Sequence, residues 1–546
     1  MNMKPGVYKG VLTKCAKLSY TKKDNSPIIL IKFPFDRETL DQVRSIPGRK
    51  YNAEKRYWTC PLTIESIEQL QSFKFNLDEY LLNKLRNKPN LKKINTIEIK
   101  GLKGELHPFQ NIGVSFIETL KGRALIADEM GLGKTVQALS WLVLHPELTP
   151  VVIVCPASLK LNWSRECSKW INNPFIQILN GTKMNVHIIG KILIINYDIL
   201  NDWKDRLKKI NPQVLILDEC QYFKNNTAIR TKAVKILGKT IPHVICLSGT
   251  PIENRPVEIY NAIHLIDPAL FPNRWAFLQR YCGAKYNGFG WDFNGASNTE
   301  ELHEKLVNSI MIRRKKKDVL KELPDKTRAF IPIELEDEKE YQTVELDFIS
   351  YIRQTKGSTA ALRASSAQVL TEIETLKQAA VKNKLKRVME WIDNFLDSGD
   401  KLVLFAVHKF VIDALIERYK TIAVKIDGSV SNTERQKNVD EFQNNPNIRL
   451  FVGNIKAAGV GITLTASSNV AFLELPWTPG ELSQAEDRCH RIGQEDKVMI
   501  YYLLANDTIE EKIAELLDEK RKVLDSVLDG IETETESLLT QLINKY

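Results

Sequence analysis

The sequence predicts an α/β protein with two doubly wound parallel-sheet lobes, preceded by a small α+β domain. Nine short blocks rich in Val, Ile and Leu alternate with helix-like stretches, which is typical of strands buried on both faces of a parallel sheet. The blocks form two sets on either side of residues 271–384, which lack this rhythm, so we expect two lobes. With 546 residues, of which 43% are hydrophobic, the chain is long enough for three or four domains.

The first element, residues 1–98, is expected to be the small α+β domain. Residues 1–105 hold 21 Lys and Arg and 11 Asp and Glu, so this stretch accounts for the whole net charge of +10. A basic domain on a neutral body indicates a polyanionic partner. Lysines that are merely solvated on a small domain explain the charge equally well.

The first lobe is expected over residues 99–270 and the second over residues 385–510. The blocks predicted as strands of the first lobe are RALIA, VVIVCP, KILIINY, VLILDE and HVICLSG. Those of the second lobe are LVLFAVH, RLFVGN, VAFLELP and VMIYYLLA. Between the lobes, residues 271–384 are expected to form helical insertions and a linker. The acidic tail, residues 511–546, has apolar residues at helical spacing, which predicts a helix packed on the second lobe.

Composition also excludes several classes of protein. No apolar run approaches the roughly 20 residues of a membrane helix, and the first ten residues lack the apolar stretch of a signal peptide. The eight cysteines are scattered singly, without a C-x-x-C pair. We therefore expect no membrane association, no zinc site and no disulfide framework, and a reducing compartment.

The stretch ALIADEMGLGKTVQAL predicts a phosphate-binding loop between a strand and a helix. The usual pattern G-x-x-x-x-G-K-[ST] has a glycine where Asp128 stands, but Gly131 and Gly133 can make the turn alone. Lys134 is expected to reach the β- and γ-phosphates, and Thr135 to ligate Mg²⁺. The predicted nucleotide-binding residues of the loop are Asp128, Glu129, Met130, Gly131, Leu132, Gly133, Lys134 and Thr135.

An acid pair downstream supports this interpretation. In VLILDECQ an apolar strand ends at Asp218 and Glu219. Asp218 is expected to hold the metal ion, and Glu219 to stand beside the γ-phosphate as the general base that orients the attacking water. The predicted cofactors are therefore ATP and Mg²⁺.

Two arginines in QAEDRCHRIGQ supply the third catalytic component. Arg488 and Arg491 are three residues apart, which predicts one helix face pointing across a cleft. An arginine in that place stabilises charge that develops on the γ-phosphate. Together with Lys134, Asp218 and Glu219, these residues predict a motor that binds ATP between two lobes.

The segments DEMGLGKT, DECQ, LSGTP and QAEDRCHRIGQ resemble the helicase superfamily-two ATPases of the sucrose-nonfermenting, chromatin-remodeller-like branch. The likeness is closest to the HARP-type annealing helicases, and it covers residues 106–512. Thr463 and Glu474 stand where most remodellers have Asn and Asp, and both choices resemble the annealing group. The resemblance implies RecA-like lobes and translocation on double-stranded DNA, and Asp128 is normal in that family.

The resemblance also implies roles for single residues. Gln110 is expected to recognise adenine. Gln221 stands where the annealing group typically has His, and with Ser248 and Thr250 it is expected to couple the lobes. The residues expected near the DNA strand or the contact between lobes are Ser158, Trp163 and Trp477.

The head resembles the HARP module of annealing helicases over residues 45–62, at Tyr51, Arg56 and Trp58. Arg56 and Trp58 are therefore expected to contact DNA. A small basic docking domain of another origin is the alternative.

The basic run RRKKK, residues 313–317, is open to two interpretations, a nucleic-acid contact or a brace between lobes. The resemblance favours a brace, with structural roles for Arg313 and Arg314. We find no element suited to the major groove, so we expect duplex or forked DNA to be bound without sequence specificity.

Three functional hypotheses follow. The first, which we prefer, is an ATP-driven DNA translocase that rewinds or regresses branched DNA in replication or repair. The second is a translocase that displaces DNA-bound proteins, and the third is a DNA-binding scaffold that does not hydrolyse ATP. The protein is expected to be monomeric, and cytoplasmic in a bacterial or phage-infected cell or nuclear in a eukaryote.

Overall fold

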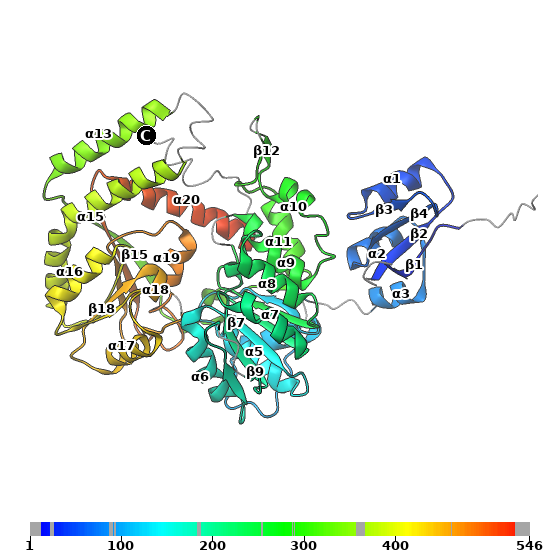
Figure 1. Ribbon diagram of the computed structural model, residues 1–546, viewed down its shortest axis with the longest axis horizontal. Helices are drawn as coiled ribbons and strands as arrows, with labels where there is room; N and C mark the ends of the chain where they lie inside the picture. The colour runs from blue at the N-terminus through cyan, green and yellow to red at the C-terminus, as the bar shows by residue number, and fades with distance from the viewer. Residues whose placement is uncertain are drawn as a thin grey trace, which may run out of the picture.

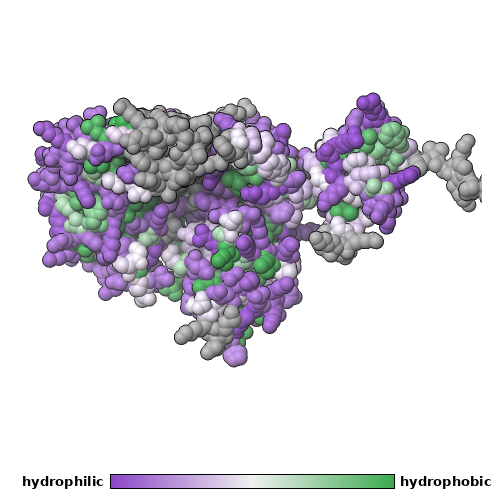
Figure 2. Space-filling model, turned by 45° about the horizontal axis from the view of Figure 1, so that its top comes forward, coloured by the Kyte–Doolittle hydropathy of each residue, from purple (hydrophilic) through white to green (hydrophobic). Residues whose placement is uncertain are grey.

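The computed structural model describes residues 13–21, 27–86, 91, 94–182, 187–252, 255–286, 288, 290–355, 366–459 and 461–529. The end of the predicted acidic tail, from residue 530, lies outside these residues. Figure 1 shows a small head beside two larger lobes, and Figure 2 shows the head as a separate mass. Within the described residues, no helix is both long and apolar enough to traverse a bilayer.

The head is a five-stranded sheet covered by three helices. Its strand order is β3-β4-β2-β1-β5, in which β1 and β5 are parallel and the other neighbours are antiparallel. Ile29, Ile31 and Val43 are buried in its own small core. The elements are β1 (Cys15–Tyr20), β2 (Pro27–Lys32), α1 (Arg37–Ser45), β3 (Lys50–Asn52), β4 (Tyr57–Pro61), α2 (Ile64–Ser72), β5 (Asn76–Leu77) and α3 (Glu79–Arg86).

Lobe 1 is built on a parallel seven-stranded sheet with the order β14-β6-β11-β10-β7-β9-β8. Successive strand residues join different apolar cores, because side chains alternate between the faces of a strand. Its strands are β6 (Arg123–Ile126), β7 (Val151–Cys155), β8 (Ile176–Ile178), β9 (Ile192–Asn196), β10 (Val214–Asp218), β11 (His243–Leu247) and β14 (Met311–Ile312). Its helices are α4 (Pro108–Thr119), α5 (Lys134–Leu144), α6 (Lys160–Trp170), α7 (Leu200–Lys209), α8 (Ile229–Gly238) and α9 (Tyr260–Ile266).

An insertion follows α9 and returns the chain to lobe 1. It contains a short hairpin between two helices, and it ends where β14 pairs with β6. Its elements are α10 (Arg274–Tyr281), β12 (Lys285–Tyr286), β13 (Trp291–Asp292) and α11 (Thr299–Val307).

Lobe 2 repeats the arrangement on a parallel six-stranded sheet with the order β15-β20-β19-β16-β18-β17. Two further apolar cores lie on its faces. Its strands are β15 (Lys326–Ile333), β16 (Leu402–Ala406), β17 (Ala423–Ile426), β18 (Leu450–Asn454), β19 (Asn469–Phe472) and β20 (Val498–Ala505). The helices are α12 (Lys316–Val319), between the lobes, and α13 (Glu338–Thr355), α15 (Ser366–Leu396), α16 (Lys409–Tyr419), α17 (Asn432–Asn444), α18 (Ile455–Ala458), α19 (Pro479–Glu486) and α20 (Ile509–Asp529).

The predicted fold class is confirmed, and all nine predicted blocks are parallel strands. The segment expected to hold only helical insertions and a linker nevertheless supplies an edge strand to each sheet, β14 to lobe 1 and β15 to lobe 2. The tail helix α20 buries Ile509, Ile513 and Leu516 in lobe 2, as expected, but it also contacts α11 of lobe 1. Leu91, Ile94 and Ile97 pack against lobe 1 rather than in the head, although they precede the expected boundary at residue 98.

Candidate nucleotide site between the lobes

The phosphate loop joins β6 to α5 in a conformation that requires its two glycines. Gly131 and Gly133 have φ angles of 85° and 76°, in the region that favours glycine. A Cβ on Gly133 would lie 2.4 Å from Nε2 of Gln110, and one on Gly131 would lie 2.9 Å from Cβ of Arg491. The loop is therefore enclosed by Gln110 of lobe 1 and by Arg491 of lobe 2.

Asp128 takes a structural position in the loop. Its fully buried carboxylate accepts hydrogen bonds from Arg314 Nε at 2.9 Å and from Gln137 Nε2 at 3.0 Å. Arg314 also donates to the carbonyl of Phe109, so it ties the loop to α4. An aspartate stands where the usual pattern has glycine because its charge anchors Arg314.

Gln110 supports the same loop from α4. Its Oε1 accepts the backbone N–H of His107 at 3.0 Å, and its Nε2 donates to the carbonyl of Leu132 at 3.2 Å. The predicted adenine-recognition residue thus lies against the loop, where its amide also fixes the loop backbone.

Lys134 is the first residue of α5, and its Nζ donates to the carbonyl of Asp128 at 3.0 Å. Burial lowers the pKa of Lys134, and the charges of Glu219, Asp128 and Asp218 oppose that effect. The loop lysine and the acid pair therefore share one electrostatic environment, as the sequence predicts.

The acid pair ends β10. Asp218 Oδ2 accepts the indole N–H of Trp163 at 2.7 Å, and burial followed by the nearby charge of Glu219 raises the pKa of Asp218. Glu219 has a φ of 50°, uncommon for a residue with a side chain. This left-handed turn takes the Glu219 side chain off the strand path, and its Oε2 accepts a hydrogen bond from Gln221 Nε2 at 2.9 Å.

A chain of hydrogen bonds runs from this carboxylate into lobe 2. Gln221 Oε1 accepts the hydroxyl of Ser248 at 2.7 Å, and Ser248 Oγ accepts the backbone N–H of Thr250 at 3.1 Å. Gln484 Nε2 of α19 then donates to Thr250 Oγ1 at 2.9 Å. We call Glu219, Gln221, Ser248, Thr250 and Gln484 the relay. The predicted coupling residues are consecutive members of it.

Arg488 and Arg491 lie at the lobe 2 side of the loop. The prediction that they share a helix face is wrong, because α19 ends at Glu486 and both residues lie in the turns that follow. They nevertheless converge, since Nη1 of each donates to the carbonyl of Ile462 at 3.3 Å. The helix ends in tight turns, because the N–H groups of Arg488 and Cys489 donate to the carbonyls three residues earlier, those of Ala485 and Glu486. The carbonyl of Arg488 then accepts the N–H of Leu464 at 2.9 Å.

Both guanidinium groups face lobe 1 in buried surroundings. Nη2 of Arg488 lies 3.7 Å from Sδ of Met130 in the loop, and Nε donates to the carbonyl of Gln484 at 3.0 Å. Burial, followed by the charge of Arg491, lowers the pKa of Arg488 to about 10. Burial also lowers the pKa of Arg491. Two cations beside a phosphate loop, Arg488 buried and Arg491 half-buried, form an environment that favours an anion.

The basic run at residues 313–317 joins the lobes. Arg313 Nη1 donates to the carbonyl of Ala127 at 3.0 Å, in lobe 1. The backbone N–H of Lys316 donates to Glu129 Oε2 at 2.7 Å, while its Nζ lies 3.0 Å from Asp487 Oδ1 in lobe 2. With Arg314 bound to Asp128, these contacts agree with a brace between the lobes.

The residues predicted near DNA are scattered. Trp163 is fully buried and bonded to Asp218, so its predicted DNA contact is not available in this conformation; its indole instead orients the acid pair. Ser158 is half-buried in the turn before α6, whose neighbour Leu159 meets Gly461 of lobe 2. Trp477 is half-buried in lobe 2, with Lys377 Nζ 4.7 Å from its ring centre.

In the head, Arg56 and Trp58 lie on the β3–β4 hairpin. Arg56 is exposed, and Trp58 pairs across the strands with Tyr51, their ring centres 5.0 Å apart. This hairpin thus presents the Tyr51–Trp58 pair of rings beside the exposed, positively charged side chain of Arg56.

The two positions that resemble the annealing group belong to lobe 2. Glu474 is buried and accepts the backbone N–H groups of Val407 and His408 at 2.7 and 2.9 Å, at the start of α16. His408 also binds Glu374 Oε1 at 2.7 Å, and these two carboxylates raise its pKa to about 9. Thr463 follows Ile462, the residue whose carbonyl receives both arginines.

Sequence reasoning missed Gln484 and Gln137. Gln484 lies four residues before Arg488, about one helical turn earlier. This spacing could have indicated that the two side chains lie close together. Gln137 follows Lys134 by three residues, so the first turn of α5 carries both toward Asp128.

Family models match most of the chain. One described as the SNF2-related domain matches residues 109–385, and one described as the helicase conserved C-terminal domain matches residues 383–493. A relative from Caenorhabditis elegans, a SWI/SNF-related matrix-associated actin-dependent regulator of chromatin subfamily A-like protein 1 homolog, is 35% identical, with 93% of this chain and 75% of that protein aligned.

Two further relatives are longer. The subfamily A-like protein 1 of Xenopus laevis is 33% identical over 90% of this chain and 52% of its own length. The human DNA annealing helicase and endonuclease ZRANB3 is 37% identical over 79% of this chain and 41% of its own length. The chain thus spans about half or less of these two proteins. Among solved structures, the Sulfolobus solfataricus SWI2/SNF2 ATPase core in complex with dsDNA is 28% identical, with a TM-score of 0.40, over 80% of this chain and 96% of that one.

Proposed function

This chain belongs to the SNF2-related ATPase family, and from that premise we propose that it is an ATP-driven translocase on double-stranded DNA that rewinds or regresses branched DNA. The relay is the observation that carries the proposal. It connects Glu219, the proposed base in lobe 1, to Gln484 in lobe 2, and the carbonyl of Gln484 receives Nε of Arg488. A change at the nucleotide can therefore reach the lobe contact through this chain of hydrogen bonds.

The residues present fit ATP and Mg²⁺. A polyphosphate would find hydrogen-bond donors and positive charge in the loop backbone at the start of α5, in Lys134 and in the guanidinium groups of Arg488 and Arg491. Thr135 and Asp218 offer the oxygen ligands that Mg²⁺ prefers. When bound, Mg²⁺ neutralises charge on the β- and γ-phosphate oxygens.

The chain's own residues divide the remaining work. Lys134 holds the terminal phosphates, and Glu219 orients a water for attack in line with the leaving oxygen. Arg491, with Arg488 beside it, supplies positive charge from lobe 2 as negative charge develops on the transferred group. Release of the cleaved phosphate removes negative charge from the cleft, which weakens the attraction that draws the arginines toward lobe 1, and the cleft opens.

The branched-DNA part of the proposal is supported by the relatives and by the head. The human relative is named a DNA annealing helicase and endonuclease, and residues 1–105, which include the head, carry the net positive charge of the chain. In this proposal the head binds a DNA branch, while the two lobes track one strand of a duplex arm. Displacement of DNA-bound proteins by the same motor is the second candidate, because the other relatives are named as chromatin regulators.

One comparison tests the proposal. ATP turnover is measured with no DNA, single-stranded DNA, linear duplex and a forked duplex, each DNA titrated up to saturation, and fork regression is measured with and without ATP. We expect duplex DNA to stimulate ATP turnover strongly, and forked DNA to reach half-maximal stimulation at the lowest DNA concentration. We also expect fork regression to depend on ATP. Turnover that no DNA stimulates would contradict the proposal, and stimulation without fork regression but with protein displacement would favour the second candidate.

A further inference from the structure

The insertion of lobe 1 carries an aromatic cluster that the motor does not use. Strand pairing places Tyr286 of β12 directly opposite Trp291 of β13, and Phe293 follows two residues later on the same face. Trp275 of α10 lies edge-on beneath this face, with ring centres 5.8 Å from Trp291 and 5.2 Å from Phe293. We call these four residues the aromatic platform.

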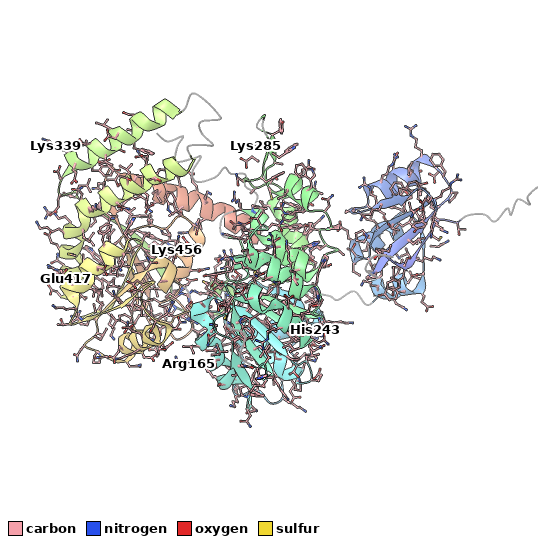
Figure 3. All side chains as sticks on the ribbon, in the orientation of Figure 1. Arg165, His243, Lys285, Lys339, Glu417 and Lys456 are labelled. Atoms are coloured by element: carbon pink, nitrogen blue, oxygen red, sulfur yellow. The ribbon has the colours of Figure 1, made fainter. Side chains whose placement is uncertain are left out.

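The platform is held in place yet open to solvent. Trp291 and Phe293 are nearly parallel, at 12°, and Trp275 stands at 87° and 82° to them, so the rings brace one another. Tyr286, Trp291 and Trp275 nevertheless remain 63%, 46% and 45% exposed. Figure 3 places Lys285, beside Tyr286, at the free end of the insertion, away from the body of lobe 1. A group of fixed, exposed rings on a projecting hairpin indicates a binding surface.

The head touches lobe 1 close, along the chain, to both the platform and the aromatic pair of the head. A Cβ on Gly48 would lie 2.8 Å from Cγ of Pro272, so the head touches lobe 1 at this point. Gly48 is three residues before Tyr51, and Pro272 is three residues before Trp275. The exposed Tyr51, paired with the half-buried Trp58, and the platform residue Trp275 thus each lie within three residues of this contact along the chain.

Local charge indicates which part of a nucleic acid the platform suits. Lys285 faces Asp292 across the hairpin, and Arg280 is paired with Glu301, with Nε and Oε1 2.9 Å apart. Of the cations near the platform, Arg280 is thus paired with a carboxylate, Lys285 lies opposite one, and Arg274 lies over the ring of Tyr260. This arrangement leaves little positive charge for the phosphate backbone. Flat rings with little net charge suit the faces of bases, which are accessible only where a strand is unpaired.

We propose that the aromatic platform binds unpaired bases of a single strand at a DNA branch by stacking, as a continuation of the Tyr51–Trp58 surface of the head. This inference rests on the proposed function for the source of the strand, since a translocase that rewinds DNA works at a junction of paired and unpaired bases. The platform would keep the unpaired strand apart from the duplex arm.

The test measures binding by the full chain without ATP, so that it is independent of the motor. The probe is a duplex with a single-stranded flap of about ten nucleotides, within known single-strand site sizes. A second probe has an abasic flap of the same length. We expect the wild type to bind the flap with bases about tenfold or more tightly than the abasic flap, since stacking contributes on this order per base.

Trp275→Ala combined with Trp291→Ala should remove most of this preference and leave affinity for a blunt duplex unchanged. Phe175→Ala is the matched control, because its ring is similarly exposed but lies next to β8, at the opposite edge of the lobe 1 sheet. Should the double variant unfold, Tyr286→Ala, which removes the most exposed ring, should reduce the preference in a folded protein.

The inference is overturned if the wild type does not distinguish the two flaps, or if the folded platform variants keep the full preference. It is also overturned if Phe175→Ala loses as much. A wild type that prefers bases but shows no duplex-stimulated ATP turnover would instead contradict the proposed function and leave the platform in place.

Discussion

Glu219 illustrates how a single backbone conformation defines a role. Its left-handed φ takes the carboxylate from the strand direction to Gln221, whereas Asp218 remains in line with β10 and accepts the Trp163 indole. Adjacent acids therefore have different partners. The sequence pattern predicted an acid pair, but it could not predict this turn or Trp163, which comes from α6 more than fifty residues earlier.

The first prediction separates binding from hydrolysis. Lys134→Ala should weaken ATP binding and abolish turnover, because the loop loses its cation. Glu219→Gln should abolish turnover with ATP affinity largely kept, because the side chain keeps its size and loses only the ability to take a proton. Equilibrium binding of labelled ATP and phosphate release measure the two effects. Wild-type turnover in Glu219→Gln would rule out this residue as the base.

Arg491→Ala should still bind ATP but hydrolyse it about 10³-fold or more slowly, the scale of arginine-finger losses. Its Cβ lies against Gly131, and its guanidinium is positioned by the Ile462 carbonyl, so the cation is held at the loop. Single-turnover hydrolysis by enzyme saturated with ATP gives the rate. If affinity falls while the rate per bound ATP does not, Arg491 has a structural role.

Gln484→Ala should uncouple the lobes without disabling the site. It removes one buried hydrogen bond, which contributes about 1 kcal/mol, so the ratio of DNA-stimulated to basal turnover should fall several-fold while basal turnover persists. Gln443→Ala is a control within lobe 2, where Gln443 binds Thr465 and Ala466. Equal loss of basal and stimulated turnover would argue against the relay.

Among the elements, strands were predicted well where they are long and apolar, and poorly where they are short or at an edge. β14 has only two residues, and it forms because β6 offers it an unpaired edge, so no local sequence pattern predicts it. The end of α19 at Glu486 was likewise not predictable from the local pattern. Arg488 and Arg491 have helical spacing, yet the N–H of Arg488 donates to the carbonyl three residues earlier, and its Nε takes the Gln484 carbonyl that a continued helix would use.

The start of α16 gives a prediction about pH. Glu374 and Glu474 raise the pKa of His408 to about 9 from its ordinary 6.5. A raised pKa in the folded state stabilises the protein fully below about pH 6.5, and this contribution is lost as the pH rises through 9. The wild type should therefore exceed His408→Gln in melting temperature at pH 6, and the difference should shrink by pH 9.5. Thermal unfolding at several pH values measures it, and a constant difference would contradict the ion-pair account.

At the scale of the whole molecule, the head is separable from the motor. Leu91, Ile94 and Ile97 pack on lobe 1, so a deletion should end at residue 86 rather than at 98. The shortened chain should remain a duplex-stimulated ATPase at saturating DNA, because none of the head residues that the structure describes belongs to the nucleotide site. It should lose the preference for forked over linear DNA, and with it fork regression.

Fork regression and ATP turnover, measured side by side, check this prediction. Arg56→Ala with Trp58→Ala should reproduce the loss of fork preference in the full chain. Fork regression at the full rate after deletion would rule out the proposed role of the head, and a chain that no longer folds would show that the head is part of lobe 1.

The two edge strands also set a mechanical limit on the motor. Residues 313–325 connect β14 to β15, and if pulled straight they would reach roughly 45 Å, at 3.3–3.6 Å per residue. A stride of one base pair is only about 3.4 Å along a strand. The connection is therefore much longer than one step requires, and it would extend fully only if the brace contacts of residues 313–317 broke and the lobes were forced far apart. Under such a load β14 would separate from its sheet before β15, because two residue pairs attach β14 to lobe 1 while eight attach β15 to lobe 2.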